Sequence, residues 1–181
     1  MREDISLHVI HLGQDDPKKC TARRICKRGL ATIHHDLRKI PNRAFLLAPN
    51  AGTLLGPDDL PSIELGASII ALDCSWKKLD DSFLSIQKKS PRLEPRTLPV
   101  LLAANPVSWG SPGRLSTVEA LAACLVLLSR IEQAEKILSS FRWGSNFLDL
   151  NKSPLDAYTN AKTREELVKL QWEFFDKPES D

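Results

Sequence analysis

Three continuous apolar segments constrain the fold more than any other feature of this sequence. They run from Ala44 to Ala48, from Ser68 to Asp73 and from Leu98 to Ala104. Strands that are covered by helices on both faces have this composition, because neither face meets water. A fourth segment, Ile5 to Leu12, carries apolar residues at alternating positions and also predicts a strand. The sequence therefore predicts a parallel α/β sheet in the first half of the chain.

Helical spacing dominates the second half. Apolar residues recur at steps of three and four from Thr117 to Phe141 and again from Thr163 to Phe175. Ser116 and Glu119 form a Ser-x-x-Glu capping box, which predicts that a helix begins there. Within the first half, the segment from Trp76 to Lys89 has the same spacing and predicts an amphipathic helix after a strand.

The pattern of apolar residues changes in mid-chain from strand and helix segments to helical spacing alone, which suggests two domains. Pro91, Pro95 and Pro99 punctuate the segment between the α/β half and the helical half. We place the boundary near residue 103, with an α/β domain over residues 1–103 and a mainly helical domain over residues 104–181.

Composition limits the possible classes of protein. The 181 residues are 42% apolar and 27% charged, as in ordinary globular proteins. The longest apolar stretch, Ala120 to Leu128, is half the roughly 20 residues that span a bilayer, so no membrane segment is expected. Arg2, Glu3 and Asp4 lack the order of a secretory signal, which favours a cytoplasmic location. We expect a monomer.

Basic residues are concentrated near the N-terminus, although the net charge is only +2. A net charge this small does not mark the whole molecule as a polycation. The concentrated residues fall within eleven positions and are Lys18, Lys19, Arg23, Arg24, Lys27 and Arg28. Two interpretations stay open at this point, a solvated helix face or a surface that contacts phosphates.

The cysteines and histidines do not form a recognisable metal motif. No Cys-x-x-Cys pair is present, and each cysteine lies in or beside an apolar segment, which predicts buried thiols. His34 and His35 adjoin Asp36, but neighbouring residues on a helix point in different directions. We therefore expect no metal site.

Polar residues at the predicted strand and helix ends indicate where a ligand binds. Asp73 ends an apolar strand, and ligands of open α/β sheets bind at the carboxyl ends of strands. A helix cap is the alternative role for Asp73. Thr21 lies at the start of the basic helix, and Ser116 and Thr117 at the start of a second helix. Two helix N-termini can converge on one anion, although plain capping explains each of them equally well.

The segment Leu98 to Gly110 runs an apolar stretch into a turn-rich loop. Small residues, proline and glycine at such a place allow the backbone to approach a flat ring, so an adenine slot is plausible there. No Gly-x-Gly-x-x-Gly or Walker sequence is present, which argues against a common nicotinamide or nucleoside triphosphate site.

Five ordered motifs carry a family resemblance that covers most of the chain. They are Asp16-Pro17-Lys18-Lys19-Cys20-Thr21, Leu72-Asp73-Cys74-Ser75-Trp76, Ala103-Ala104-Asn105-Pro106-Val107, Leu115-Ser116-Thr117-Val118-Glu119-Ala120-Leu121-Ala122-Ala123 and Phe141-Arg142-Trp143-Gly144. In this order they resemble the ribosomal RNA aminocarboxypropyltransferases of small-subunit biogenesis. The resemblance implies that S-adenosylmethionine donates a 3-amino-3-carboxypropyl group to N3 of a uridine derivative, typically N1-methylpseudouridine, in small-subunit rRNA or the pre-ribosomal subunit.

The same resemblance implies a fold. Members of the family are expected to have a SPOUT-like parallel α/β N-terminal domain with a deep trefoil knot, followed by a helical domain that completes the cofactor site. Periodicity supports the two kinds of domain but carries no information on a knot. The chain lacks a long acidic extension and in this respect resembles a compact archaeal member of the family.

Residue roles follow from the resemblance. Thr21 and Thr117, with Ser116 at the same helix start, are implied to hold the cofactor carboxylate. The backbone of Leu72 meets the ribose, and Trp76 covers the methyl group of the sulfonium. The adenine slot is implied to be lined by Leu47, Pro49, Leu98 and Leu115.

The resemblance makes Asp73 the candidate base for the uracil imide, or else a residue that only orients the uridine. It also makes the six basic residues from Lys18 to Arg28 more probable contacts for RNA. Two alternatives to the transferase remain, a methyltransferase with the same cofactor and fold and a non-catalytic ribosome assembly factor.

Overall fold

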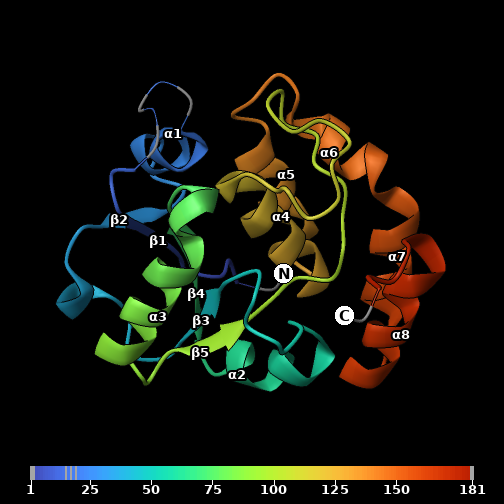
Figure 1. Cartoon of the computed structure of the whole chain (residues 1–181), viewed down its shortest axis with the longest axis horizontal. Coiled ribbons are helices and arrows are strands. Elements are labelled where there is room, and N and C mark those ends of the chain that lie inside the picture. Colours follow the sequence, from blue (N-terminus) through green and yellow to red (C-terminus); the bar gives the residue numbers. More distant parts are fainter. Residues whose placement is uncertain (1–2, 15, 17, 19, 180–181) are drawn as a thin grey trace.

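A single parallel sheet organises the chain (Figure 1). The computed structural model describes residues 3–14, 16, 18 and 20–179. In the described part the sheet has five strands in the order β2-β1-β4-β3-β5, and every neighbouring pair is parallel. The strands are β1 (Leu7–His11), β2 (Thr32–His34), β3 (Ala44–Leu47), β4 (Ser68–Asp73) and β5 (Glu94–Arg96).

Helices cover the sheet and fill the second half of the chain (Figure 1). The α-helices are α1 (Thr21–Lys27), α2 (Leu60–Glu64), α3 (Leu79–Lys89), α4 (Thr117–Leu127), α5 (Ile131–Leu138), α6 (Gly144–Leu150), α7 (Lys152–Asn160) and α8 (Arg164–Phe174). Short 3-10 turns are η1 (Leu37–Lys39), η2 (Pro57–Asp59) and η3 (Trp76–Lys78). In the part of the chain that the structure describes, no helix has the length and apolar character needed to cross a membrane.

Alternation along β4 divides the core into two layers. Successive side chains of a strand point to opposite faces of the sheet. Ile69 accordingly packs in the larger cluster, together with residues of α1 and α4, whereas Ile70 packs in a smaller cluster with Phe83 and Ile86 of α3. Both faces of the central strands are therefore covered, as the continuous apolar segments predicted.

Most predicted elements are confirmed at their approximate positions. Strands lie within three of the four predicted segments, and the capping box of Ser116 and Glu119 begins α4. The long helical segment is broken between Leu127 and Ile131, where Ser129 has a φ of 60°. The short edge strand β2 was not predicted, since its three residues carry too little pattern.

The predicted strand from Leu98 to Ala104 is wrong. The fifth strand lies earlier, at Glu94–Arg96, and the apolar segment after it is an extended stretch held by side chains of the helical half. Asn151 bonds both the N–H and the C=O of Leu102, at 2.7 and 2.9 Å. At Val100, Gln171 accepts from the N–H and the Tyr158 hydroxyl donates to the C=O. The loop that follows supplies further backbone bonds, from the N–H of Gly113 to the C=O of Leu101 and between Ala103 and the loop residues Gly110 and Ser111, with an isolated antiparallel bridge between Leu102 and Pro112. The segment is apolar because helices bury it, and its backbone is satisfied outside the main sheet.

The expectation of a SPOUT-like N-terminal domain with a deep trefoil knot is not supported, and we correct it. The observed architecture is one five-stranded parallel α/β sheet with covering helices. The pattern of apolar residues fixes which segments are buried, but it carries no information on how the chain is threaded. The division into domains at residue 103 stays a prediction, and the larger core cluster contains residues from both sides of it, such as Ile69 and Leu121.

A histidine pair on the β1–β2 edge makes stability sensitive to pH. The ring nitrogens His8 Nδ1 and His34 Nε2 lie 2.9 Å apart. Burial, and secondly the neighbouring His34, lowers the pKa of His8 from 6.5 to about 4, and burial also lowers the pKa of His34. Between pH 6.5 and about pH 4 the unfolded chain therefore binds more protons than the folded chain. The contribution of this pair to stability is fully present above pH 6.5 and is lost as the pH falls toward 4.

We expect the melting temperature to decrease between pH 7 and pH 5 by a larger amount in the parent protein than in His8→Asn. Each 1 kcal/mol of stability corresponds to about 2–4 °C for a chain of this size. Thermal unfolding followed by circular dichroism at both pH values measures the difference. Equal decreases in the two proteins would show that the histidine pair does not cause the pH dependence.

Candidate functional site

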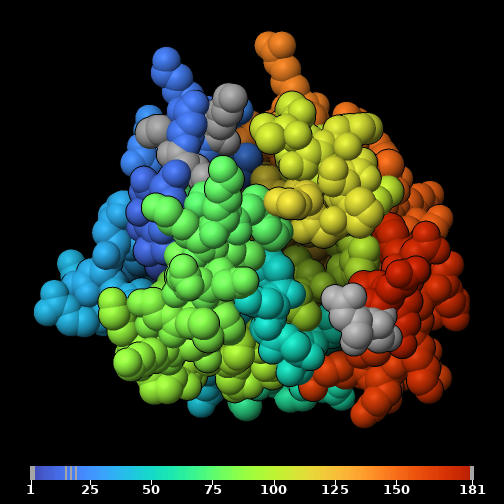
Figure 2. Space-filling view, viewed as in Figure 1, coloured from blue at the N-terminus to red at the C-terminus, as the bar shows by residue number. Residues whose placement is uncertain are grey.

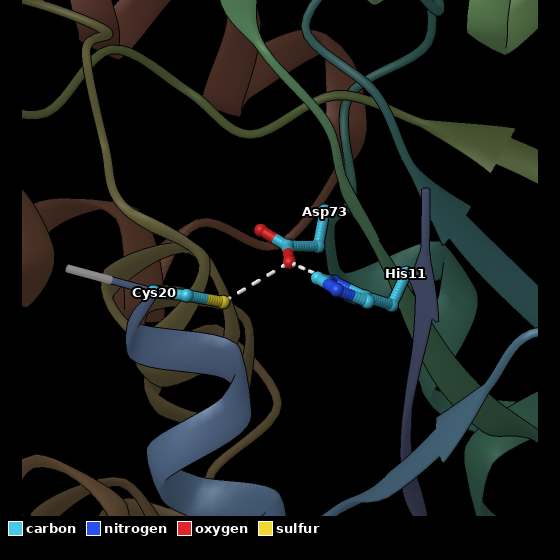
Figure 3. A group of neighbouring side chains, drawn as sticks. All are labelled: His11, Cys20 and Asp73. Carbon is cyan, nitrogen blue, oxygen red and sulfur yellow. Dashed lines mark hydrogen bonds and ion pairs between the residues drawn. The ribbon is translucent and has the colours of Figure 1, made fainter. Parts of the chain in front are cut away.

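Asp73 is the centre of a cluster of polar side chains at the carboxyl end of β4 (Figure 3). Its carboxylate is buried and has three side-chain partners. Oδ2 lies 2.6 Å from Nδ1 of His11 and 3.2 Å from Sγ of Cys20, and Oδ1 lies 3.3 Å from Oγ1 of Thr117. The N-cap of the 3-10 turn that follows is Ser75, so the interpretation of Asp73 as that cap is replaced by a link between three elements.

His11 reaches Asp73 because the two residues are aligned in neighbouring strands. They are paired in the β1–β4 register, and both end their strands at the same edge of the sheet. On the other side of the imidazole, Nε of Arg23 donates to Nε2 at 3.3 Å. Since Nε2 accepts this bond, the ring proton of a neutral His11 is on Nδ1 and points to Asp73.

Cys20, and not Thr21, is the N-cap of α1. Its sulfur accepts from the N–H of Arg23 at 3.4 Å, and its thiol donates to Asp73. Burial, with a further contribution from the Asp73 charge, raises the pKa of Cys20 to about 11, so the thiol keeps its proton at neutral pH. Thr21 takes the first helical position, where its hydroxyl accepts from the N–H of Val118 at 3.2 Å.

The starts of α1 and α4 therefore meet, as the sequence suggested. Thr21 of α1 bonds the backbone of α4, and Thr117 of α4 bonds Asp73. Among the described residues, the anion at which both helix starts converge is the carboxylate of Asp73 itself.

A cavity of about 1410 Å³ lies beside this cluster. Figure 2 shows the surface hollowed between the yellow loop that precedes α4 and the green α3. The structure brings together in its wall Asp73 and all of the predicted cofactor residues, Thr21, Leu47, Pro49, Leu72, Trp76, Leu98, Leu115, Ser116 and Thr117. Four of the predicted RNA-binding residues, Lys18, Arg23, Arg24 and Lys27, also line it. Arg28 is exposed at the end of α1 and is not part of the wall, and Lys19 lies outside the described residues.

Trp76 lies at the wall of the cavity, and the exposed fraction of this residue is 42%. The guanidinium of Arg114, from the loop before α4, lies over this ring at 5.0 Å from its centre. A cation over the face of an indole is attracted by the negative charge density of that face. The ring therefore already accommodates a cation in this structure.

Sequence reasoning missed the wider role of Glu119. Its side chain is fully buried and accepts four hydrogen bonds. Two come from the backbone N–H groups of Ala104 and Asn105, one from the Asn105 amide and one from the N–H of Ser116, at 2.6 to 3.0 Å. Only the last of these belongs to the capping box, and the other three fix the loop that forms one wall of the cavity.

Comparisons with known proteins agree with the resemblance in the sequence. A family model described as the C-terminal part of ribosome biogenesis proteins matches residues 45–175. A protein of Methanosarcina acetivorans is 44% identical over 168 residues, 93% of each chain, and one of Halobacterium salinarum is 41% identical over 172 residues, 95% of this chain and 98% of that one. Both are named 16S rRNA aminocarboxypropyltransferase. This chain belongs to that family.

A solved structure of the aminocarboxypropyltransferase family has the same fold. It is described as the SAM-dependent rRNA:acp-transferase Tsr3 from Vulcanisaeta distributa. It is 28% identical, covers 92% of this chain and 96% of its own, and superposes with a TM-score of 0.78. This match, to a transferase with a parallel α/β sheet, replaces the SPOUT-like, knotted description that the sequence had suggested.

A second family model, a possible Fer4-like domain in RNase L inhibitor, matches residues 5–36. The four-thiolate type of iron–sulfur cluster is held by four cysteines. This segment contains two, Cys20 and Cys26, so it does not supply the thiolates of such a cluster.

Proposed function

We propose that this aminocarboxypropyltransferase uses S-adenosylmethionine to modify N3 of a pseudouridine, or N1-methylpseudouridine, in small-subunit rRNA. The observation that carries the proposal is the single cavity in which Thr21, Thr117, Trp76 and Asp73 lie around the carboxyl end of β4. Its volume and its mixture of apolar walls and polar groups suit a nucleoside with a charged tail. A cytoplasmic location and a monomeric state are part of the same proposal.

In this reaction the bound S-adenosylmethionine supplies an electrophilic γ-carbon next to a positively charged sulfur. A bond forms between uridine N3 and this carbon while the carbon–sulfur bond breaks. The electron pair of that bond goes to the sulfur, which leaves as the neutral thioether of 5′-methylthioadenosine. The proton of N3 passes to Asp73 or to water. All three carbons on the sulfur are electrophilic, so the choice of the γ-carbon depends on orientation.

The residues of the cavity would set that orientation. The Thr21 hydroxyl accepts from Val118, and no hydrogen bond among the described residues uses its own hydrogen, which can donate to the cofactor carboxylate. Thr117 would exchange its bond to Asp73 for the same carboxylate. The apolar walls at Leu47, Pro49, Leu98 and Leu115, with the backbone of Leu72, would hold the adenosine.

Basic residues at the cavity would hold the RNA. Lys18, Arg23, Arg24 and Lys27 line the cavity, and Arg28 is exposed at the C-terminal end of α1. Contacts between these side chains and phosphates release counterions, so the affinity for RNA should fall steeply with increasing salt.

Two forms of labelled cofactor test the proposal. Small-subunit RNA incubated with the protein should acquire label from carboxyl-labelled S-adenosylmethionine and none from methyl-labelled S-adenosylmethionine. Incorporation of the methyl label would identify a methyltransferase. A lack of cofactor binding in calorimetry would point to an assembly factor. Mass spectrometry of RNA from a deletion strain then identifies the nucleotide.

Replacement of Trp76 by alanine is expected to weaken cofactor binding by about tenfold, which corresponds to 1.4 kcal/mol. The variant loses the ring face that Arg114 occupies here and that would cover the sulfonium methyl. Isothermal calorimetry with S-adenosylmethionine measures the change. Trp109→Ala is the matched control, because this tryptophan is 57% exposed and does not line the cavity. Equal losses in both variants would contradict the role of Trp76.

A further inference from the structure

The carboxylate of Asp73 accepts hydrogen bonds from three different elements. His11 of β1 and Cys20 at the cap of α1 both donate to Oδ2 (Figure 3). Thr117 of α4 donates to Oδ1. Both Asp73 and His11 are almost completely buried, so water does not replace these donors. An ionised carboxylate can accept all three bonds at once, whereas protonation of Oδ2 would place an O–H against the donors of His11 and Cys20.

We infer that His11 and Cys20 are positioning residues, which hold the Asp73 carboxylate ionised and aimed at the cavity where the uridine binds. The inference rests on the proposed function, because that function assigns Asp73 its role as a base for the uridine. Neither residue touches the reacting atoms. Both act on the reaction through the charge and direction of one carboxylate.

The geometry around His11 fixes its role as a donor. Arg23 donates to Nε2, so that nitrogen presents a lone pair, and an imidazolium would place an N–H against the N–H of the guanidinium. The proton on Nδ1 lies on the side of Asp73, whose Oδ2 is 2.6 Å from Nδ1. The arginine thus selects the tautomer, and the histidine transmits this choice to the carboxylate.

Cys20 is a donor for a related reason. The raised pKa keeps its proton on the sulfur, and the sulfur lone pairs already accept the N–H of Arg23 in the helix cap. The titratable and charged groups that face Asp73 are His11 from β1 and Cys20 and Cys26 from α1, with Arg23 behind His11. From α4 it is faced by the neutral hydroxyl of Thr117.

The same three side chains also have the composition of a metal site. Their ligand atoms, on His11, Cys20 and Asp73, all lie within 4.8 Å of one another. A zinc ion would need the lone pair of His11 Nδ1 and a deprotonated Cys20. Nδ1 carries the proton here because Arg23 occupies Nε2, and the thiol is protonated. The hydrogen-bonded arrangement is therefore the one that the structure favours.

Paired variants test the inference. His11→Ala removes the N–H donor, whereas His11→Asn keeps an amide N–H near the place of Nδ1. Cys20→Ala and Cys20→Ser form a second pair, since serine keeps a hydroxyl donor. His8→Asn is the matched control on the same strand, because His8 bonds Ser6 and His34 and does not line the cavity.

We expect His11→Ala and Cys20→Ala to lower kcat by about 10-fold to 100-fold, which is at most the lower end of general-base effects because both residues act through Asp73. The dissociation constant of S-adenosylmethionine, measured by calorimetry, should change less than about threefold, near 0.6 kcal/mol. The acid limb of the pH–rate profile should move to higher pH in both, because loss of a donor disfavours the ionised carboxylate. His11→Asn and Cys20→Ser should restore most of the rate and the profile.

Two results would overturn the inference. One is an unchanged pH profile with a lower melting temperature in His11→Ala, which would make the role of His11 purely structural. The other is micromolar binding of Zn²⁺ alone in equilibrium dialysis that both His11→Asn and Cys20→Ser abolish, which would make the cluster a metal site.

A failure of the inference can be distinguished from a failure of the proposed function by a measurement that does not depend on activity. Carbon-13 NMR of the Asp73 carboxyl follows its titration without any activity, and it should move to higher pH in His11→Ala but less in His11→Asn. If the parent protein transferred methyl groups instead, the same kinetic series would be measured on that reaction. An Asp73 titration that is identical in the parent protein and in His11→Ala would refute the inference in either case.

Discussion

Replacement of Asp73 by alanine is expected to slow aminocarboxypropyl transfer by about 100-fold, the lower end of general-base contributions. Cofactor affinity should change little, by less than about threefold, or 0.6 kcal/mol. The physical reason lies in the partners of the carboxylate. Loss of Asp73 releases the hydroxyl of Thr117, which is then free to donate to the cofactor carboxylate, and it removes a negative charge from the same part of the cavity.

The two quantities are measured separately, the rate by single-turnover transfer at saturating S-adenosylmethionine and the affinity by calorimetry. Asp81→Ala is the matched control, because this exposed carboxylate in the first turn of α3 does not line the cavity. If Asp73→Ala lost rate and affinity by the same factor, the carboxylate would be part of the cofactor site and would not act on the uridine.

The sequence was informative where a pattern is local. Continuous apolar segments marked β3 and β4, because a strand that is covered on both faces needs apolar residues at every position. It also marked Asp73, since a polar residue that ends such a strand lies at the ligand edge of a parallel sheet. The capping box of Ser116 located the start of α4 to the residue.

Patterns failed where the partner of a segment is distant in sequence. The apolar stretch from Leu98 to Ala104 looked like a strand of the sheet. Its backbone is instead bonded by side chains of the helical half, Asn151, Gln171 and Tyr158, and by the loop from Gly110 to Gly113. No local signal distinguishes burial under helices from burial within a sheet. The knot expected from the family resemblance failed for a similar reason, because it concerns the path of the whole chain.

The partners of Asp73 were missed although one signal for them is present. His11 lies next to the end of the first predicted strand, Ile5 to Leu12, and Asp73 ends another, and the carboxyl ends of parallel strands lie at one edge. The strand order is needed to make the two strands neighbours, and the sequence does not contain it. Cys20 was interpreted as an ordinary buried thiol, whereas the structure leaves the residue partly exposed and bonds its thiol to the carboxylate.

Glu119 carries the second large expected effect, because one buried carboxylate satisfies four donors. Glu119→Ala would leave the N–H groups of Ala104, Asn105 and Ser116 and the Asn105 amide without their acceptor. An unsatisfied buried donor costs about 1–3 kcal/mol, and water that enters the space recovers part of this. We expect a loss of about 3–5 kcal/mol in the free energy of unfolding, in the range found when one partner of a buried charged network is removed.

The same substitution should weaken cofactor binding, by about 10-fold or more, which is 1.4 kcal/mol. Glu119 holds the loop that carries Leu115 in the cavity wall and Arg114 over the ring of Trp76, so a loose loop must be ordered again on binding. Denaturant unfolding and calorimetry measure the two effects. Gln133→Ala is the matched control, since this buried side chain bonds the backbone of Ile5 away from the cavity and its loss should lower stability alone. Unchanged cofactor affinity in Glu119→Ala would mean that the loop keeps its shape without the carboxylate, and the wall of the cavity would then have to be ordered by its packing.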